Sequence, residues 1–324
     1  MKTSASSAAS SATTGTAKRI LCIGMPVRDL TFRVRDLPVR GGKMRADHFD
    51  ELAGGNALNA AVGIARLGGG VTFSGPMGDI SEKPDKYIFD RLDAEGIDHS
   101  GIVHMPGIVT PISNIMIDPS GERTIVTFRD PGLWKVTLPD PDTLLNGIDA
   151  VLTENRCASF VTGLCIEARR RNIPVVVDAD QVMSLREGLL TASSHMIFSA
   201  ETLFATAGLQ DAEAALRRIA ALTKSFVGVT QGAHGMTWLD GDGKLRHMPS
   251  FPVHTVDTLG AGDVFHGAFA LAIAEGASIE HAMRFASAAA ALKCTRFGGA
   301  FAAPDRREVE ELLRQSSTPT SAAV

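Results

Sequence analysis

The second half of the chain alternates between short apolar runs and longer segments with helical periodicity. The runs typical of buried strands are 150–153, 174–178, 195–198 and 226–230, and helical segments include 159–171 and 212–222. Such alternation predicts parallel strands joined by helices that cover both faces of a sheet. The same alternation begins earlier in the chain, with an apolar run at 19–24 and a helical segment at 56–67. The sequence therefore predicts an α/β fold.

Two segments rich in strand-forming residues stand outside this alternation. Residues 30–50 are divided by turn residues at Pro38 and Gly41–Gly42, and residues 110–130 are divided by a turn at 119–122. We expect these segments to form a small sheet beside the main one. The simplest partition is one large α/β domain with this β-rich excursion, rather than two domains.

The ends of the chain differ in composition from its middle. The first 17 residues are rich in Ser, Ala and Thr, with one Lys and no apolar core typical of a signal peptide. We expect residues 1–17 to be a disordered tail, residues 18–312 to form the domain, and residues 313–324 to be a second flexible tail.

Charge and cysteine spacing exclude several classes of protein. The net charge of −4 and the lack of a basic run argue against a nucleic-acid or membrane binder, and no apolar stretch is long enough to span a bilayer. The four cysteines lack the short spacings of a zinc site or a redox pair. We expect reduced thiols in a cytoplasmic protein.

The segment 253–267 carries the strongest chemical signal. A strand pattern runs into Gly260, Ala261 and Gly262, and a helical pattern begins at Asp263. Small residues at a strand-to-helix turn let amide groups approach an anion, and the helix dipole favours negative charge there. A carboxylate beside such an anion can serve as the general base for phosphoryl transfer. Taken alone, the pattern also fits an ordinary helix capped by Asp.

A second signal precedes the first long helix. Gly54 and Gly55 are followed by Asn56, and Asn59 lies one turn further along. Paired glycines allow close approach of the backbone to a ligand, and carboxamides bind polyols through both donor and acceptor atoms. By itself this pattern also fits a turn followed by an Asn N-cap.

Together with Asp29 and the segment 230–235, these two motifs resemble those of the ribokinase/PfkB family of carbohydrate kinases. The resemblance covers residues 18–312 and implies a ribokinase-like three-layer α/β/α fold with a mainly parallel sheet. Residues 30–50 and 107–131 would then form a β-rich lid over the substrate, which often serves as a dimer interface too. The absence of a P-loop motif and of protein-kinase motifs disfavours other kinase classes.

The resemblance also implies roles for individual residues. Asp263 corresponds to the catalytic base, and the amides of Gly260, Ala261 and Gly262 correspond to the anion hole. The residues that match sugar-binding positions are Asp29, Gly55 and Asn59, and those that match the nucleotide loop are Thr230, Gly232 and Gly235.

Cofactors follow from the same resemblance. The family uses ATP with Mg²⁺, which is held chiefly by phosphates and water. Asp257 corresponds to the side-chain ligand of a monovalent cation such as K⁺, and carbonyls near 259, 293, 296 and 298 would complete that site. The family's Asn-x-x-Glu element is replaced here by Ser199–Thr202. This departure leaves the magnesium assignment open, with Glu201 as a candidate replacement in a shifted register.

Several segments resemble the sulfofructose kinase branch more than ribokinase itself. In that branch a Lys, an Arg and an Asn hold a sulfonate, and the matching residues here are Lys43, Arg156 and Thr127, the last a departure. Two cations would suit an anionic group at the far end of the sugar. We therefore expect a primary hydroxyl of an anionic ketose, such as 6-deoxy-6-sulfofructose, to be the acceptor.

Other functions remain alternatives at this point. Ribose, 2-keto-3-deoxygluconate, fructose 6-phosphate and nucleosides are possible acceptors within the kinase class. A catalytically silent sugar-binding regulator on the same fold is an alternative of another class, although the intact Asp263 argues against it.

Overall fold

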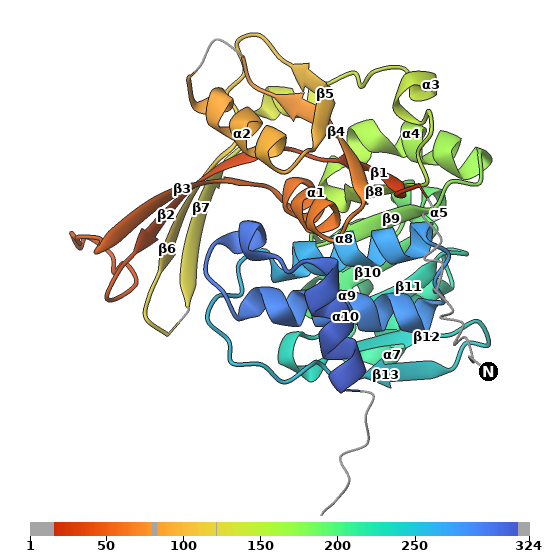
Figure 1. Ribbon diagram of the computed structural model, residues 1–324. Helices are drawn as coiled ribbons and strands as arrows, with labels where there is room; N and C mark the ends of the chain where they lie inside the picture. The colour runs from red at the N-terminus through yellow and green to blue at the C-terminus, as the bar shows by residue number, and fades with distance from the viewer. Residues whose placement is uncertain (1–15, 80–82, 121, 317–324) are drawn as a thin grey trace, which may run out of the picture.

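The computed structural model describes residues 16–79, 83–120 and 122–316, and Figure 1 shows their arrangement. Within this part of the chain, nine strands form the main sheet in the order β13-β12-β11-β10-β9-β8-β1-β4-β5. They are β1 (Arg19–Ile23), β4 (Gly70–Met77), β5 (Asp98–His104), β8 (Ala150–Glu154), β9 (Val175–Ala179), β10 (His195–Ser199), β11 (Phe226–Thr230), β12 (Met236–Leu239) and β13 (Leu245–Met248). All neighbouring strands are parallel except in the pairs β11–β12 and β12–β13. The predicted α/β fold with a mainly parallel sheet is confirmed.

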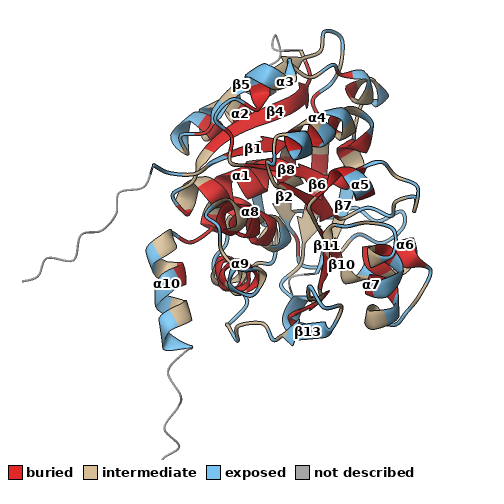
Figure 2. Cartoon of the chain, turned by 90° about the vertical axis from the view of Figure 1, so that its right-hand side faces the viewer, coloured by how far each residue is buried: buried red, intermediate tan, exposed pale blue. Residues whose placement is uncertain are grey.

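Helices cover both faces of this sheet. One face carries α1 (Asn56–Arg66), α2 (Lys83–Ala94), α8 (Ala261–Ala274), α9 (Ile279–Cys294) and α10 (Arg306–Gln315). The other carries α3 (Pro141–Leu144), α4 (Ala158–Arg170), α5 (Leu189–Ala192), α6 (Ala200–Ala207) and α7 (Ala212–Ala220). Strand β1 shows why two cores form: Ile20 and Cys22 pack into one, while Leu21 and Ile23 pack into the other. Figure 2 shows the buried strands between helices whose outer sides are exposed.

A four-stranded lid sheet projects from the main body (Figure 1). Its order is β3-β2-β6-β7, with β2 (Val27–Arg33), β3 (His48–Gly54), β6 (Ile112–Ile117) and β7 (Arg123–Phe128). Side chains alternate between the two faces of such strands. One face, which we call the inner face, carries Asp29 and contacts the body, and the opposite one is the outer face.

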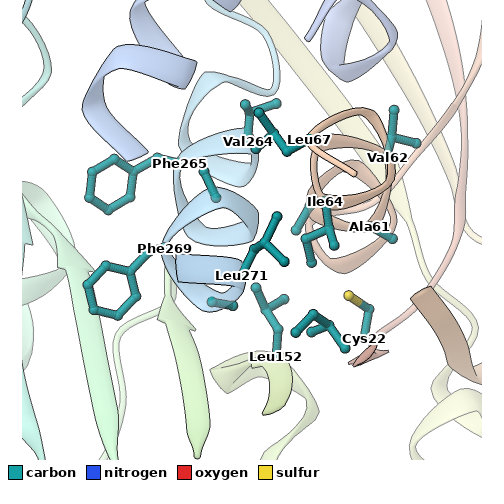
Figure 3. Close-up of a cluster of buried hydrophobic side chains, with 14 of the residues drawn as sticks. Cys22, Ala61, Val62, Ile64, Leu67, Leu152, Val264, Phe265, Phe269 and Leu271 are labelled. Carbon is teal, nitrogen blue, oxygen red and sulfur yellow. The ribbon is translucent and has the colours of Figure 1, made fainter. Parts of the chain in front are cut away.

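A cluster of buried hydrophobic side chains fills the space between α1 and α8 (Figure 3). Ile64 of α1, the α1 C-cap residue Leu67, and Val264 and Leu271 of α8 are all fully buried there. The helices approach so closely that a Cβ on Gly267 would lie 2.4 Å from the carbonyl oxygen of Ala60. This packing holds the first turn of α8 against the first turn of α1.

Some parts of the structure lie outside the sequence predictions. Strands β5, β12 and β13 and helices α6, α9 and α10 were not predicted, and α10 extends past the expected domain end at 312. Most of both predicted tails lies outside the described residues. All four cysteines are free thiols. No helix in the described ranges is both long and apolar enough to cross a membrane.

Candidate active site

The first turn of α8 presents free amide groups. Gly260, its N-cap, has φ of 76°, a left-handed conformation that glycine adopts readily, and no side chain caps the helix. The amide of Ala261 donates to the carbonyl of Thr258, and the amide of Val264 donates to the carbonyl of Gly260. The amides of Gly262 and Asp263 donate to no backbone carbonyl among the described residues. Two free N–H groups at a helix N-terminus can bind an anion.

A pocket of about 530 Å³ opens beside this turn. The predicted nucleotide residues Thr230, Gly232 and Gly235 line it together with Ala261 and Gly262. Its remaining wall is largely apolar and includes Phe251, Pro252, Val253 and Phe265. An apolar cavity beside free amides is suited to a nucleotide, because its walls can contact the base and the amides can bind the phosphates.

On the other side of the same turn, Asp263 meets the second sequence motif. The Nδ2 of Asn59 donates to Oδ2 of Asp263 at 2.7 Å. Asn56, at the start of the same helix, donates to Oδ2 of Asp178 and to Oδ2 of Asp180, both at 3.0 Å. The buried ring of His266 lies with Nε2 3.5 Å from Oδ1 of Asp178.

Burial and neighbouring charge perturb these acids. Burial raises the pKa of Asp263 well above its ordinary value, and the negative charge of Asp178 raises it further, while the Asn59 hydrogen bond opposes the change. Burial likewise raises the pKa of Asp178, with Asp180 adding to the effect. Acids whose pKa values approach neutrality are suited to proton transfer.

Asp29 lies on the inner face of the lid. Backbone pairing places it beside Ser113, and Ser113 beside Thr127, so the three form one row across β2, β6 and β7. The hydroxyls of Ser113 and Thr127 are 3.1 Å apart. Burial raises the pKa of Asp29 to about 6, against the opposing effects of the Ser113 hydrogen bond and the charge of Arg129. A Cβ on Gly54 would lie 2.0 Å from Oδ2 of Asp29, so any larger residue there would displace this carboxylate.

Two guanidinium groups lie near these acids. Arg156 pairs with Glu154 (Nε to Oε2, 3.1 Å) and with Asp180 (Nη2 to Oδ2, 2.5 Å). Glu154 is 3% exposed, and burial raises its pKa to about 7 although Arg156 opposes this. Arg129, half-buried just after β7, makes no hydrogen bond or ion pair within the described residues, and its Nε is buried without a partner. Burial and the charge of Arg156 lower the pKa of Arg129.

The predicted anion-binding residues thus differ in their surroundings. Arg156 is already paired with two carboxylates. Lys43 is exposed on the connection between β2 and β3 and has no side-chain partner in the part of the chain that the structure describes. Thr127 is bonded to Ser113 in the lid.

Asp257 lies in the segment before α8, where the sequence predicts a monovalent-cation ligand. Its Oδ1 accepts from the amide of Leu259 at 2.8 Å, and its Oδ2 accepts from the amide of Gly299 at 3.2 Å. The ammonium of Lys293 lies 3.0 Å from the same Oδ2 and donates to the backbone oxygen of Asp257 at 2.7 Å. Lys293 is fully buried.

The segment that replaces the Asn-x-x-Glu element has a structural role. Ser199 caps α6 by accepting from the amide of Thr202, and the two hydroxyls are 2.8 Å apart. Glu201 is exposed. Within the described ranges, no group of three His, Cys, Asp or Glu side chains is arranged to hold a metal ion. These residues do not form a magnesium site made of protein ligands. Binding of Mg²⁺ through nucleotide phosphates and water stays a prediction.

The structure therefore brings Asp29, Asn59 and Asp263 to one side of the α8 turn and the nucleotide residues to the other. The charged residues that surround them were not predicted from the sequence: Glu154, Asp178, Asp180, Arg129 and Lys293. Three of these could have been found, because Glu154, Asp178 and Asp180 lie at the carboxyl ends of parallel strands, where α/β proteins bind ligands.

Known proteins are similar to this chain in sequence and in fold. Residues 17–306 match the family model described as pfkB family carbohydrate kinase. Ribokinase from Bacillus subtilis is 29% identical over 305 residues, covering 91% of this chain and 99% of that protein. The crystal structure of a putative ribokinase from Agrobacterium tumefaciens has 37% identity and a TM-score of 0.87, covering 93% of this chain and 98% of its own. The structure of Arabidopsis thaliana ribokinase complexed with ribose and ATP has 25% identity and a TM-score of 0.81, covering 92% and 99%.

Proposed function

This chain belongs to the pfkB family of carbohydrate kinases, and we propose that Asp263 is the general base of its reaction. The protein is an ATP-dependent sugar kinase. In the proposed reaction, Asp263 takes the proton from a primary hydroxyl of the sugar as that oxygen attacks the γ-phosphorus of ATP and ADP leaves. The observation that carries this role is the position of Asp263 between the free amides of α8 and the polar cluster around Asn59.

The surrounding residues are suited to this reaction. The free amides of Gly262 and Asp263, with the neighbouring Gly260, can stabilise negative charge on the transferring phosphoryl group. Mg²⁺ bound to ATP would neutralise further phosphate charge. Asn59 orients one oxygen of Asp263, which leaves the other available to the acceptor hydroxyl. Asp29 and Glu154 supply acceptors for other hydroxyls of the sugar.

We further propose that the acceptor is an anionic ketose, such as 6-deoxy-6-sulfofructose. The supporting observation is Arg129, a half-buried guanidinium without a partner among the described residues, whose charge acts on Asp29, Glu154 and Asp180. A buried cation is costly unless an anion compensates it. We therefore assign Arg129 the main role in holding the anionic group, with Lys43 closing from the lid and the paired Arg156 contributing less.

A neutral pentose is the second candidate. The relatives described above are ribokinases, and one of their structures contains ribose and ATP. The pairing of Arg156 with Glu154 and Asp180 also favours a neutral acceptor. These two carboxylates already neutralise the charge of Arg156, so it does not need an anionic group on the sugar.

A coupled ADP-release assay across neutral, carboxylated, phosphorylated and sulfonated sugars tests both proposals. Asp263→Asn should abolish turnover of every substrate, whereas the matched surface variant Asp242→Asn should retain it. A fully active Asp263→Asn enzyme would contradict the assignment of the base.

Specificity is tested with Arg129→Met and the matched variant Arg186→Met, which changes an exposed arginine. Loss of a hydrogen bond to a charged group corresponds to about tenfold to hundredfold in KM, and we expect this only for an anionic sugar and only in Arg129→Met. Lys43→Ala and Arg156→Ala should have smaller effects. If the best substrate is neutral and Arg129→Met leaves its KM unchanged, the ribokinase alternative is correct.

We also propose that two copies of the chain associate through the outer face of the lid. Strand alternation places Phe32, Phe49, Val126 and Phe128 on this face, and the last three are 50%, 63% and 54% exposed. Contiguous exposed apolar side chains are typical of an interaction surface. Sedimentation of the wild type and of Val126→Glu tests this: the wild type should be a dimer and the variant a monomer.

A further inference from the structure

Lys293 is a buried cation that the proposed mechanism does not use. It projects from the last turn of α9, and its side chain is fully buried. Its ammonium contacts two atoms of one residue, the backbone oxygen and Oδ2 of Asp257. A buried ammonium is costly unless it is paired and hydrogen-bonded, so this contact requires an explanation.

The position of Asp257 is the one at which the sequence predicts a monovalent-cation site. The Asp257 carboxylate does not fit such a site, because both of its oxygens already accept hydrogen bonds and one of them is paired with an internal cation. Oδ1 binds the Leu259 amide, and Oδ2 binds both the Gly299 amide and the Lys293 ammonium. Of the nearby carbonyls, that of Lys293 accepts from the Arg296 amide at 3.2 Å. A bound K⁺ would have to displace an internal cation from the same carboxylate.

We propose that the Lys293 ammonium permanently replaces the monovalent cation at Asp257, so that this enzyme works without K⁺ or Na⁺. An ammonium group is a compact charge with three donors, so it can neutralise the carboxylate and bind a carbonyl at once. Because it is covalently attached, its occupancy does not depend on the salt composition of the solution.

Lys293 acts as a positioning residue through Asp257. The Asp257 carboxylate joins the turn before α8 to the loop at Gly299. Gly260 of that turn is packed so closely that a Cβ on it would lie 3.0 Å from the amide nitrogen of Ala300. Neutralised Asp257 thus holds the turn whose amides face the nucleotide pocket, and removal of the ammonium should loosen it.

The first experiment uses the wild-type protein in tetramethylammonium buffer free of K⁺ and Na⁺. At constant ionic strength, replacement of tetramethylammonium chloride by KCl should change kcat less than about twofold and leave the thermal unfolding midpoint of the substrate-free protein unchanged. Activation by KCl together with a raised midpoint would overturn the proposal. The midpoint requires no substrate, so it tests the proposal even if no sugar is turned over.

The second experiment removes the ammonium. In Lys293→Ala, we expect kcat to fall at least about tenfold and to recover in part when KCl or ethylammonium chloride is added. The unfolding midpoint of this variant should now rise with KCl. Lys244→Ala, which changes an exposed lysine, should behave as the wild type. A soluble Lys293→Ala protein with unchanged kcat, or with loss that neither cation restores, would contradict the proposal; if the variant does not fold, the wild-type measurements decide.

Discussion

Asn59 donates a hydrogen bond of 2.7 Å from Nδ2 to Oδ2 of Asp263, although 204 residues separate them in the chain. The bond joins the first turn of α1 to the first turn of α8, two helices that pack closely through Gly267. It also stabilises the charged form of Asp263, so it lowers a pKa that burial and Asp178 raise. The reactivity of the base therefore depends on both neighbours.

Substitution of Asn59 by Leu should weaken the base. Loss of the hydrogen bond further raises the pKa of Asp263, so the rise of kcat/KM with pH should move to higher pH. We expect kcat/KM at pH 7 to fall by about tenfold to hundredfold, because a general base contributes about a hundredfold or more and only part of this is lost. Asn146→Leu, at an exposed position, is the control. An unchanged pH profile would show that this bond does not tune the base.

Substitution of Asp178 by Asn should have the opposite effect on the pH profile. It removes a negative charge that raises the pKa of Asp263, so the acidic limb of kcat/KM should move to lower pH. The profiles of the wild type and both variants, measured with one substrate, separate these effects. If Asp178→Asn moves the limb upward or not at all, the titrating group is not Asp263.

Asp29→Asn should stabilise the protein while it weakens sugar binding. Burial moves the pKa of Asp29 from 3.8 to about 6, which corresponds to about 3 kcal/mol of unfolding free energy. Because the folded protein binds this proton more tightly than the unfolded chain, the stability is present below pH 3.8 and is lost as the pH rises through 6. Urea unfolding should therefore show a gain for Asp29→Asn that grows between pH 4 and 6 and then stays constant. A variant less stable than the wild type at pH 7.5 would contradict this account.

Local sequence patterns predicted much of the fold because they report local physics. The strands of the parallel sheet are buried on both faces, so they appear as continuous apolar runs, and glycine marks the ends of helices such as α1. Strand β5 was missed because Asp98–His104 lies at the sheet edge and is mostly polar. Helix α6 was missed because its N-terminal segment, Ser199–Thr202, stands in place of the Asn-x-x-Glu element and was interpreted as a ligand-binding segment rather than as a helix cap.

The charged partners in the site were harder to predict. Lys293 lies within a helical run, and nothing near it in sequence indicates that its ammonium reaches Asp257, 36 residues away. Arg129 follows an ordinary lid strand, and its proximity to Arg156 depends on how the lid meets the body. Such contacts arise from tertiary packing, which cannot be predicted from the spacing of residues in the sequence.

Two arginines on the inner face of the lid contact the catalytic half of the molecule. Arg123 donates from Nη1 to Oγ1 of Thr258 at 3.0 Å, just before the α8 turn. The guanidinium of Arg33 lies 4.3 Å from the centre of the Phe297 ring. These contacts join the sugar-covering sheet to the segments that hold the anion-binding amides, so lid closure and ordering of the α8 turn should be coupled.

A double-mutant cycle with Arg123→Met and Thr258→Val tests this coupling. Because one hydrogen bond from an exposed side chain contributes roughly 0.5–1.5 kcal/mol, each single variant should lower kcat/KM for the sugar by about twofold to tenfold. The double variant should lose no more than the larger single effect, since both changes remove the same bond. Arg35→Met, which alters another exposed lid arginine, should have no effect. Additive losses would show that the two residues act independently, and the lid would then close without this contact to the α8 turn.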